Sequence, residues 1–291
     1  MLNIAQAFPI VLGQAILPQR LQRTPEKNGE SAVMDAEKSV HQYDEAMESK
    51  LVLVYAGALV QFHRCRRRTT GGIAIDLCCG PGHFALMLAK YFDFEKVIGV
   101  DLSRPMIEAA KTNAEKWGLA DRVEFNVGDP TCVGRESSSA DILTCNHALH
   151  HFEDILVVGK LLGEMNRLAK TDGLVVATDL VRLKTECLTE RYTRLIGAYY
   201  LARGMDAFQQ DFCDSMRAAW TEDEIAGVVQ HLDKRSWHHR QQRLLPTIQT
   251  ICGYPVDDCP RIVRDGVPWP AELCPVPCKM RRAWKVFCAF Q

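Results

Sequence analysis

The sequence predicts an α/β fold with a mostly parallel sheet, and two observations support this. Short apolar runs alternate with segments of helical periodicity from residue 73 to residue 179. A glycine-containing turn follows the first apolar run, and an acidic residue ends the second run about 20 residues further on. Crossovers between parallel strands are right-handed, so the carboxyl ends of the strands meet at one edge, where ligands gather.

The first strand is expected over residues 73–77, an apolar run suited to burial on both faces. A tight turn follows over residues 78–82. In it, Gly80 and Gly82 tolerate positive φ and close approach of a ligand. A helix over residues 84–92 comes next. Such a strand-turn-helix directs free N–H groups at whatever lies above the turn.

The second strand is expected over residues 97–100 and ends at Asp101. At this spacing from the glycine turn a carboxylate can accept both hydroxyls of a ribose, which predicts a nucleoside-containing cofactor. The G-x-G-x-x-G pattern of dinucleotide folds is not present here. The turn instead reads Asp-Leu-Cys-Cys-Gly-Pro-Gly, with the acidic residue ahead of the glycines.

These residues resemble the first motif of the class I S-adenosylmethionine-dependent methyltransferases, in which an acidic residue precedes G-x-G. Cys78 stands where many members have glycine, as it does in the similar ubiquinone and menaquinone C-methyltransferases. Further motifs match in order over residues 100–107, 123–130, 141–152 and 170–179. The resemblance covers roughly residues 35–235. It implies a Rossmann-like doubly wound, mostly parallel sheet with N-terminal lid helices and a divergent C-terminal tail.

The resemblance also implies S-adenosylmethionine as the cofactor and suggests a role for each matching residue. Gly80 and Gly82 make room for its aminoacyl part, Asp101 takes the ribose hydroxyls, and Asp76 lies near the methionine amino group or braces the turn. The other residues expected at the cofactor are Cys78, Cys79, Leu102, Met106, Gly128, Asp129, Pro130 and Asn146. Among these, Leu102 and Met106 would pack on adenine, Gly128 and Asp129 would face it, and Asn146 would contact the methionine portion.

The expected reaction is methyl transfer to a small-molecule acceptor whose nucleophile is O, N or C. A general base is useful only if the acceptor is a hydroxyl or an acidic carbon. His150 is the first candidate, ahead of His147 and His151, and a structural histidine is the alternative. The competing interpretation of the whole chain is a non-catalytic module that binds the cofactor or a partner.

Composition limits the other function classes. A formal net charge of −1 gives no basic face for nucleic acid, and no run reaches the roughly 20 apolar residues of a membrane span. The 12 cysteines are spread over a large α/β chain and predict reduced thiols in the cytoplasm. A mitochondrial location is the alternative, because residues 1–34 carry no acid before Glu26. The expected assembly is a monomer or homodimer.

The expected organisation is an N-terminal extension (1–34), a methyltransferase domain (35–245) and an irregular tail rich in Cys and Pro (246–291). The spacing of Cys252, Cys259, Cys274 and Cys278 fits structural zinc poorly, so no metal site is predicted. Helical periodicity over 34–66 suggests a lid with Tyr43 and Asp44 as candidates. Residues 183–205 suggest another helix, residues 221–224 a capped helix start, and residues 236–242 with 247–252 an antiparallel pair.

Overall fold

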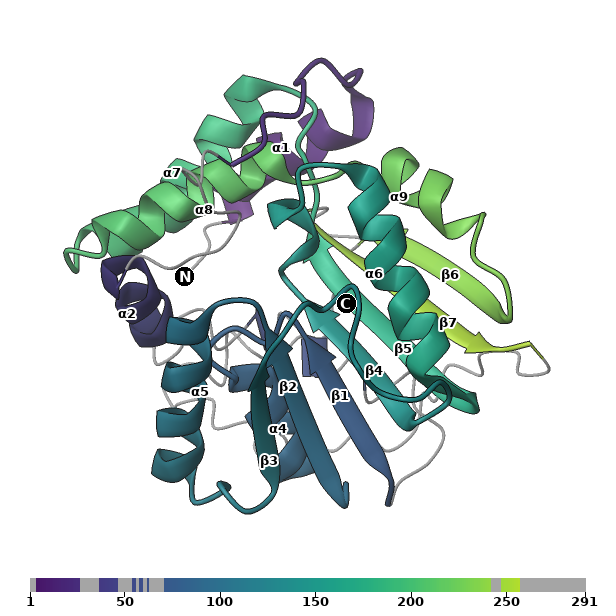
Figure 1. Ribbon diagram of the computed structural model, residues 1–291. Helices are drawn as coiled ribbons and strands as arrows, with labels where there is room; N and C mark the ends of the chain where they lie inside the picture. The colour runs from purple at the N-terminus through teal and green to yellow at the C-terminus, as the bar shows by residue number, and fades with distance from the viewer. Residues whose placement is uncertain are drawn as a thin grey trace.

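A computed structural model provides the structure of this chain and describes residues 4–26, 37–46, 54–55, 58–59, 62, 71–241 and 247–256. The described strands form one seven-stranded sheet in the order β3-β2-β1-β4-β5-β7-β6 (Figure 1). Their bounds are β1 Ile73–Leu77, β2 Lys96–Asp101, β3 Val123–Val127, β4 Ala140–Asn146, β5 Ala169–Leu180, β6 Arg235–Gln241 and β7 Ile248–Pro255.

Strands β1 to β5 pair in parallel, and β7 runs antiparallel to both of its neighbours, β5 and β6. This confirms the predicted mostly parallel sheet and its closing antiparallel pair. Strand β7 lies beyond residue 245, in the part assigned to an irregular tail, and residues 248–255 of that part are regular strand. The three domain limits themselves stay predictions.

Helices cover both faces of the sheet because its strands are apolar on both sides. Helices α4 (His83–Tyr91) and α5 (Arg104–Trp117) pack on one face, where Ala74 of β1 joins their core. Helices α6 (Ile155–Leu168) and α9 (Glu222–Val229) pack on the other face, with Ile75 and Leu77 (Figure 1). The predicted helix over 84–92 is confirmed as α4, with ends that agree within one residue.

Local capping explains where several helices begin and end. The Ser103 hydroxyl accepts a hydrogen bond from Met106 N at the start of α5, and Gly118 ends that helix in the left-handed conformation. Thr221 and Glu224 form a reciprocal capping box at the start of α9, as the predicted helix start required.

A second group of helices lies together at one end of the sheet (Figure 1). It consists of α1 (Ile4–Ile16), α7 (Glu186–Leu201) and α8 (Asp206–Ala218), while α2 (Glu37–Ala46) lies beside α8 and α5. Ile10 of α1 is buried in one apolar cluster with Leu188 and Tyr192 of α7, so part of the N-terminal extension belongs to the packed structure.

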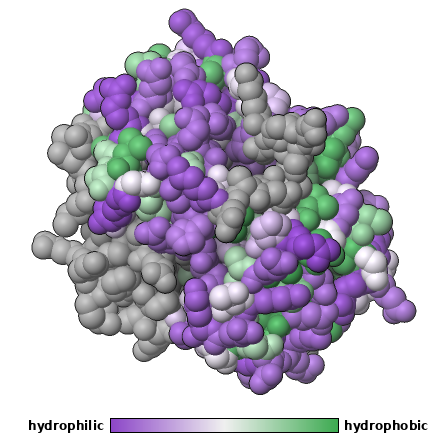
Figure 2. Space-filling view, turned by 60° about the vertical axis from the view of Figure 1, so that its left-hand side comes forward, coloured by the Kyte–Doolittle hydropathy of each residue, from purple (hydrophilic) through white to green (hydrophobic). Residues whose placement is uncertain are grey.

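The surface drawn in Figure 2 is mostly hydrophilic, and its hydrophobic atoms lie in small separate patches. Within the part of the chain that the structure describes, no helix has the length and apolar character needed to cross a membrane. Buried apolar residues of the described elements instead form the clusters on the two faces of the sheet and two smaller clusters among the helices at its end.

Candidate cofactor and acceptor site

The residues predicted to hold a cofactor lie at the carboxyl ends of neighbouring strands. Asp76 is near the end of β1, Asp101 ends β2, Gly128 and Asp129 follow β3, and Asn146 ends β4. Because β1 pairs with both β2 and β4, these strand ends are adjacent. The sheet thus brings the predicted residues to one edge, although their contacts with a cofactor stay predictions.

The turn after β1 holds three residues with positive φ: Cys78 at 54°, Gly80 at 51° and Gly82 at 77°. A left-handed conformation is strained for cysteine, which explains why glycine suits position 78. A Cβ on Gly80 would meet no atom within 4 Å, whereas one on Gly82 would lie 2.5 Å from the ring of Phe125. Gly80 therefore leaves open space at the turn, and Gly82 permits close packing beneath it.

Two carboxylates organise this edge. Asp101 accepts hydrogen bonds from Gly80 N at 2.8 Å and Ser103 N at 2.9 Å, which ties the end of β2 to the glycine turn. Asp76 is buried and accepts a hydrogen bond from the Thr144 hydroxyl at 2.7 Å. Burial raises the pKa of Asp76 to about 7, even though the bond from Thr144 acts in the other direction.

The residues expected at adenine surround the ends of β2 and β3. Met106 is buried, Leu102 is 47% exposed and Pro130 is buried. Asp129 is exposed and accepts hydrogen bonds from the backbone and hydroxyl of Thr131. A cavity of about 270 Å³ between β2, β3 and the loop after β3 is lined in part by Gly128 and Asp129. Open space therefore adjoins two of the predicted adenine-side residues.

Asn146 presents a buried donor beside Asp76. Its Oδ1 accepts a hydrogen bond from the Thr178 hydroxyl at 2.7 Å, which orients the amide. Its Nδ2 is buried and lies close enough to the Asp76 carboxyl to lower the pKa of that group, but it has no hydrogen-bond partner of good geometry among the described residues. Asn146 and Asp76 therefore present a polar donor and acceptor together at the ends of β1 and β4.

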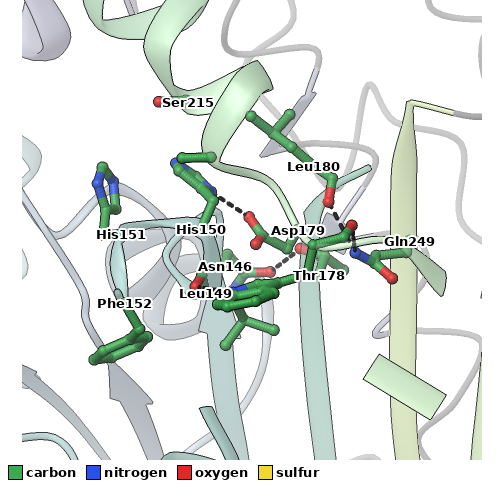
Figure 3. Close-up of polar contacts among 12 residues, drawn as sticks. Asn146, Leu149, His150, His151, Phe152, Thr178, Asp179, Leu180, Ser215 and Gln249 are labelled. Carbon is green, nitrogen blue, oxygen red and sulfur yellow. Dashed lines mark hydrogen bonds and ion pairs between the residues drawn. The ribbon is translucent and has the colours of Figure 1, made fainter. Parts of the chain in front are cut away.

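His150 forms a buried pair with Asp179 (Figure 3). It lies in the short helical turn η2, Leu149–His151, after β4, and Asp179 lies near the end of β5. Their Nδ1 and Oδ1 atoms are 2.6 Å apart, and the side chains are 4% and 0% exposed. The carboxylate accepts, so Nδ1 carries a proton, and in the neutral form of this ring Nε2 keeps its lone pair. This tautomer suits proton abstraction or metal ligation by Nε2.

Glu26 and His151 extend this pair into a cluster. Glu26 Oε2 lies 2.6 Å from His151 Nδ1, and Glu26 Oε1 accepts a hydrogen bond from the Ser215 hydroxyl at 2.7 Å. Glu26 Oε1 also lies 4.0 Å from His150 Nε2. Burial opposes ionisation, but His151, His150 and Ser215 together lower the pKa of Glu26 to about 2. Likewise, the Glu26 carboxylate raises the pKa of His151 against the effect of burial.

Residues 17–26, here called the N-terminal strap, bring Glu26 to the site. The Arg23 guanidinium lies 3.7 Å from the centroid of a Trp220 ring. The same guanidinium donates hydrogen bonds to the carbonyls of Ala218, Glu153, His150 and Phe152. Backbone N–H groups of Arg20 and Leu21 donate to the Lys184 carbonyl. The strap is thus bonded to the turn that carries His150.

The candidate lid residues behave differently from each other. The Tyr43 and Tyr55 hydroxyls are 2.6 Å apart, and the Tyr55 ring meets His147 edge-on. Burial raises the pKa of Tyr43 to about 12, and the charges of Asp101, Asp179 and Asp76 act in the same direction. The Tyr43 phenol is therefore within electrostatic reach of Asp76 and Asp101 at the strand ends and of Asp179, the partner of His150.

Asp44 instead anchors α2 to the helices below it. Its Oδ1 accepts a hydrogen bond from Asn113 Nδ2 at 2.7 Å and lies 2.8 Å from His83 Nε2. His147, the second candidate base, has a φ of 55°, and burial lowers its pKa to about 4. It is consequently neutral at ordinary pH.

Several site residues were not predicted from the sequence. Asp179 had a local signal, since it lies near the carboxyl end of a predicted strand, where site residues converge. Glu26 had none. No metal site was predicted either, yet Glu26, His150 and His151 place potential ligand atoms within 4.8 Å of one another. Of the C-terminal cysteines, Cys252 is buried in β7, and Cys259, Cys274 and Cys278 lie outside the described residues.

Comparison with known proteins agrees with this geometry. Residues 74–173 match the model of a family described as a methyltransferase domain. Over these residues the chain is similar to a methyltransferase domain. The match runs from β1 into β5, and it therefore includes the glycine turn, Asp101, Asn146 and His150.

Individual relatives of the methyltransferase domain cover only part of the chain. The uncharacterized methyltransferase YcgJ of Bacillus subtilis is 32% identical over 123 residues, 42% of this chain and 45% of its own length. A demethylmenaquinone methyltransferase of Leptospira interrogans is 32% identical over 111 residues, 38% of this chain and 43% of its own length. The chain thus spans less than half the length of these curated relatives.

Solved structures resemble a larger part of the chain. A SAM-dependent methyltransferase from Aquifex aeolicus has a TM-score of 0.53 at 14% identity, covering 76% of this chain and 98% of its own. A candidate S-adenosyl-L-methionine-dependent methyltransferase from Methanococcus maripaludis has a TM-score of 0.56 at 20% identity, covering 79% and 98%. At these identities the likeness shows the shared Rossmann-like fold alone.

Proposed function

We propose that this chain transfers the methyl group of S-adenosylmethionine to a small-molecule acceptor with an O, N or C nucleophile. The observation that carries the proposal is the edge where Gly80 leaves open space, Asp101 braces the glycine turn, and the buried Asn146 amide lies beside Asp76. These features fit a nucleoside ligand with a polar amino-acid end.

The cofactor would supply a methyl group already activated on a sulfonium, and the chain would mainly orient the reactants. Asp101 and the turn at Gly80 would hold the ribose and aminoacyl parts, and Asn146 Nδ2 would donate to the methionine portion. Asp76, once ionised, would face the methionine amino group. Holding donor and acceptor in line can contribute roughly 7–11 kcal/mol to lowering a barrier.

His150 would take the acceptor proton where the acceptor is a hydroxyl or an acidic carbon. Asp179 would act as a positioning residue, because its bond to Nδ1 fixes the tautomer that leaves Nε2 free to accept. An amine acceptor that enters neutral needs no such base. Loss of turnover in His150→Ala with unchanged cofactor affinity would therefore indicate a hydroxyl or carbon acceptor. Unchanged turnover would indicate an amine acceptor.

A second candidate function is a methyltransferase domain that binds the cofactor without turning over. It is favoured by the position of Glu26, whose carboxylate is 4.0 Å from His150 Nε2 and is anchored through the N-terminal strap. A strap that stays in place would restrict access of an acceptor to His150. Transfer of an isotope-labelled methyl group to any of a set of phenol, amine and carbon-acid acceptors would remove this alternative.

Location and assembly are further parts of the proposal. The described cysteines are all free thiols, and this supports a reducing compartment such as the cytoplasm. A monomer or homodimer stays the expected assembly, to be measured by light scattering on the purified chain.

The test of cofactor binding is calorimetric titration of the purified chain with S-adenosylmethionine and with S-adenosylhomocysteine. Asp101→Ala should weaken both affinities roughly tenfold to a hundredfold, the range for losing hydrogen bonds to a charged group. Asp121→Ala is the matched control, because Asp121 is exposed and precedes β3 at the opposite end of the sheet. No binding by the unaltered chain, or equal binding by Asp101→Ala, would reject the cofactor site.

A further inference from the structure

We propose that Glu26, His150 and His151 bind one divalent transition-metal ion. Two of these residues are consecutive in the turn η2 after β4, and the third comes from the N-terminal strap. Their potential ligand atoms lie within 4.8 Å of one another, and the side chains of Glu26, His150 and His151 are 6%, 4% and 28% exposed. The site lies beside the proposed acceptor position but does not depend on S-adenosylmethionine.

The available ligand atoms of the cluster lie close together. Asp179 occupies Nδ1 of His150, so the available atom of this ring is Nε2. That atom faces Glu26 Oε1 at 4.0 Å, a separation that is too long for a hydrogen bond. An ion with bonds of about 2.0–2.2 Å to nitrogen and oxygen can bridge such a pair. The spacing is therefore suitable for metal coordination.

The neighbours of the cluster match those that surround metal ligands. A ligating histidine usually donates its other ring N–H to a carboxylate, as His150 does to Asp179 at 2.6 Å. The carboxylate of Glu26 is itself oriented by the Ser215 hydroxyl at 2.7 Å. Asp179 and Ser215 thus already orient His150 and Glu26 in the absence of an ion.

Charge also favours a cation at this position. Glu26 and Asp179 place two carboxylates in the interior, with side-chain exposures of 6% and 0%. Buried charges are unfavourable unless they are paired or coordinate a metal. In the metal-free arrangement His151 Nδ1 lies 2.6 Å from Glu26 Oε2 and shares a proton with it. Metal binding would replace this proton and release it to solvent.

The ligand types narrow the choice of ion. Imidazole nitrogen suits Zn²⁺ and its transition-metal neighbours, whereas Mg²⁺ and Ca²⁺ prefer oxygen ligands. Two histidines and one carboxylate leave at least one coordination position open. An oxygen of the acceptor could occupy it and be polarised by the ion. In that case His150 Nε2 is a metal ligand, and proton abstraction falls to another group.

The test uses the full-length chain stripped of metal with a chelator and titrated with Zn²⁺ or with Co²⁺ as a spectroscopic substitute. We expect one ion per chain by elemental analysis and cobalt absorption bands typical of nitrogen and oxygen ligands. Glu26→Gln and His151→Ala should lose stoichiometric binding. Asp179→Asn should weaken it roughly 10–100-fold, as expected for a group that orients a ligand.

His238→Ala is the matched control, since His238 is exposed on β6 and should leave binding unchanged. Glu26→Gln keeps the shape of the side chain and an acceptor for Ser215, so it provides a folded variant if His151→Ala is unstable; thermal unfolding checks both. No binding by the unaltered chain, equal binding by Glu26→Gln, or cobalt–thiolate charge-transfer bands would overturn the proposal. Titration of the metal-free chain with S-adenosylmethionine tests the proposed function separately. Cofactor binding without metal binding would overturn the metal site alone.

Discussion

At the scale of single residues, Gly80 and Gly82 have different tasks in the same turn. A Cβ on Gly80 meets open space, while one on Gly82 meets Phe125 and Ala110 at 2.5–2.9 Å. Gly80→Ala should therefore weaken S-adenosylmethionine binding strongly, at a folding cost of about 1–2 kcal/mol from its positive φ. Gly82→Ala should add a further cost of about 1–3 kcal/mol from overpacking.

Urea unfolding and calorimetric titration of the two variants measure these effects separately. Gly163→Ala in α6, where a Cβ also meets no atom within 4 Å, controls for adding a methyl group far from the turn. If Gly80→Ala bound the cofactor as well as the unaltered chain, the open space at the turn would not be the cofactor position.

The buried carboxyl of Asp76 predicts a pH-dependent stability. Its pKa rises from 3.8 to about 7 on folding, so the folded chain binds this proton more tightly than the unfolded chain. The stabilisation of the folded chain by this tighter proton binding is fully present below about pH 4 and is lost as the pH rises to about 7. Asp76→Asn does not titrate. As the pH rises across this range, the unfolding free energy of Asp76→Asn should therefore increase relative to that of the unaltered chain, by on the order of a few kcal/mol.

Urea unfolding of both cofactor-free proteins at about pH 5 and about pH 8 measures the difference. A gap between them that stays constant with pH would show that Asp76 is ionised throughout. S-adenosylmethionine should reduce the gap, because its cationic amino group favours the ionised carboxylate.

At the scale of elements, Arg23 is the main anchor of the N-terminal strap. It stacks on Trp220 and donates to four carbonyls, one at the end of α8 and three between the start of η2 and the start of α6. Arg23→Ala should lower the unfolding free energy by about 1–3 kcal/mol, the range for hydrogen bonds to a charged group. It should also speed hydrogen exchange in residues 17–26, because their C-terminal end would then be held only by Glu26 and by the bond from Thr24 N to the Arg217 carbonyl.

Hydrogen-exchange mass spectrometry of the strap is the measurement. Gln22→Ala, an exposed neighbour in the same segment, is the control. Arg23→Lys should restore only part of the protection, since an ammonium cannot reproduce the planar guanidinium fork. Unchanged exchange in Arg23→Ala would mean that α1 packing alone holds the strap.

At the scale of the whole molecule, β7 completes the sheet. It pairs with β5 from Val175 to Leu180 and with β6 along its other edge, and Ile251 is fully buried. A chain ending at Pro246 should therefore leave β5 with an unpaired edge and lose cooperative unfolding. A chain ending at Val256 keeps every described strand and is the control. Cooperative unfolding of the shorter chain would instead support the predicted domain limit at residue 245.

The sequence by itself determined the order of the core elements and many of the residues at the sheet edge where the cofactor is proposed to bind. Strand and helix periodicities are local, and parallel strands place their carboxyl ends together, so Asp76, Asp101 and Asn146 could be assigned to one edge in advance. His150 could be named for the same reason. Glycine at the position of Cys78 in many members of the similar family indicates a strained backbone there, although the φ of 54° is known only from the structure.

Only the tertiary structure decided what surrounds His150. Glu26 is 125 residues from its partner His151, and Asp179 is 29 residues from His150, so neither pairing leaves a local pattern. The contact between Tyr43 and Tyr55 likewise depends on how α2 packs. Such clusters arise because distant segments fold onto one edge of the sheet. Residue spacing along the chain carries no record of that approach, so the metal-ligand cluster could be found only in three dimensions.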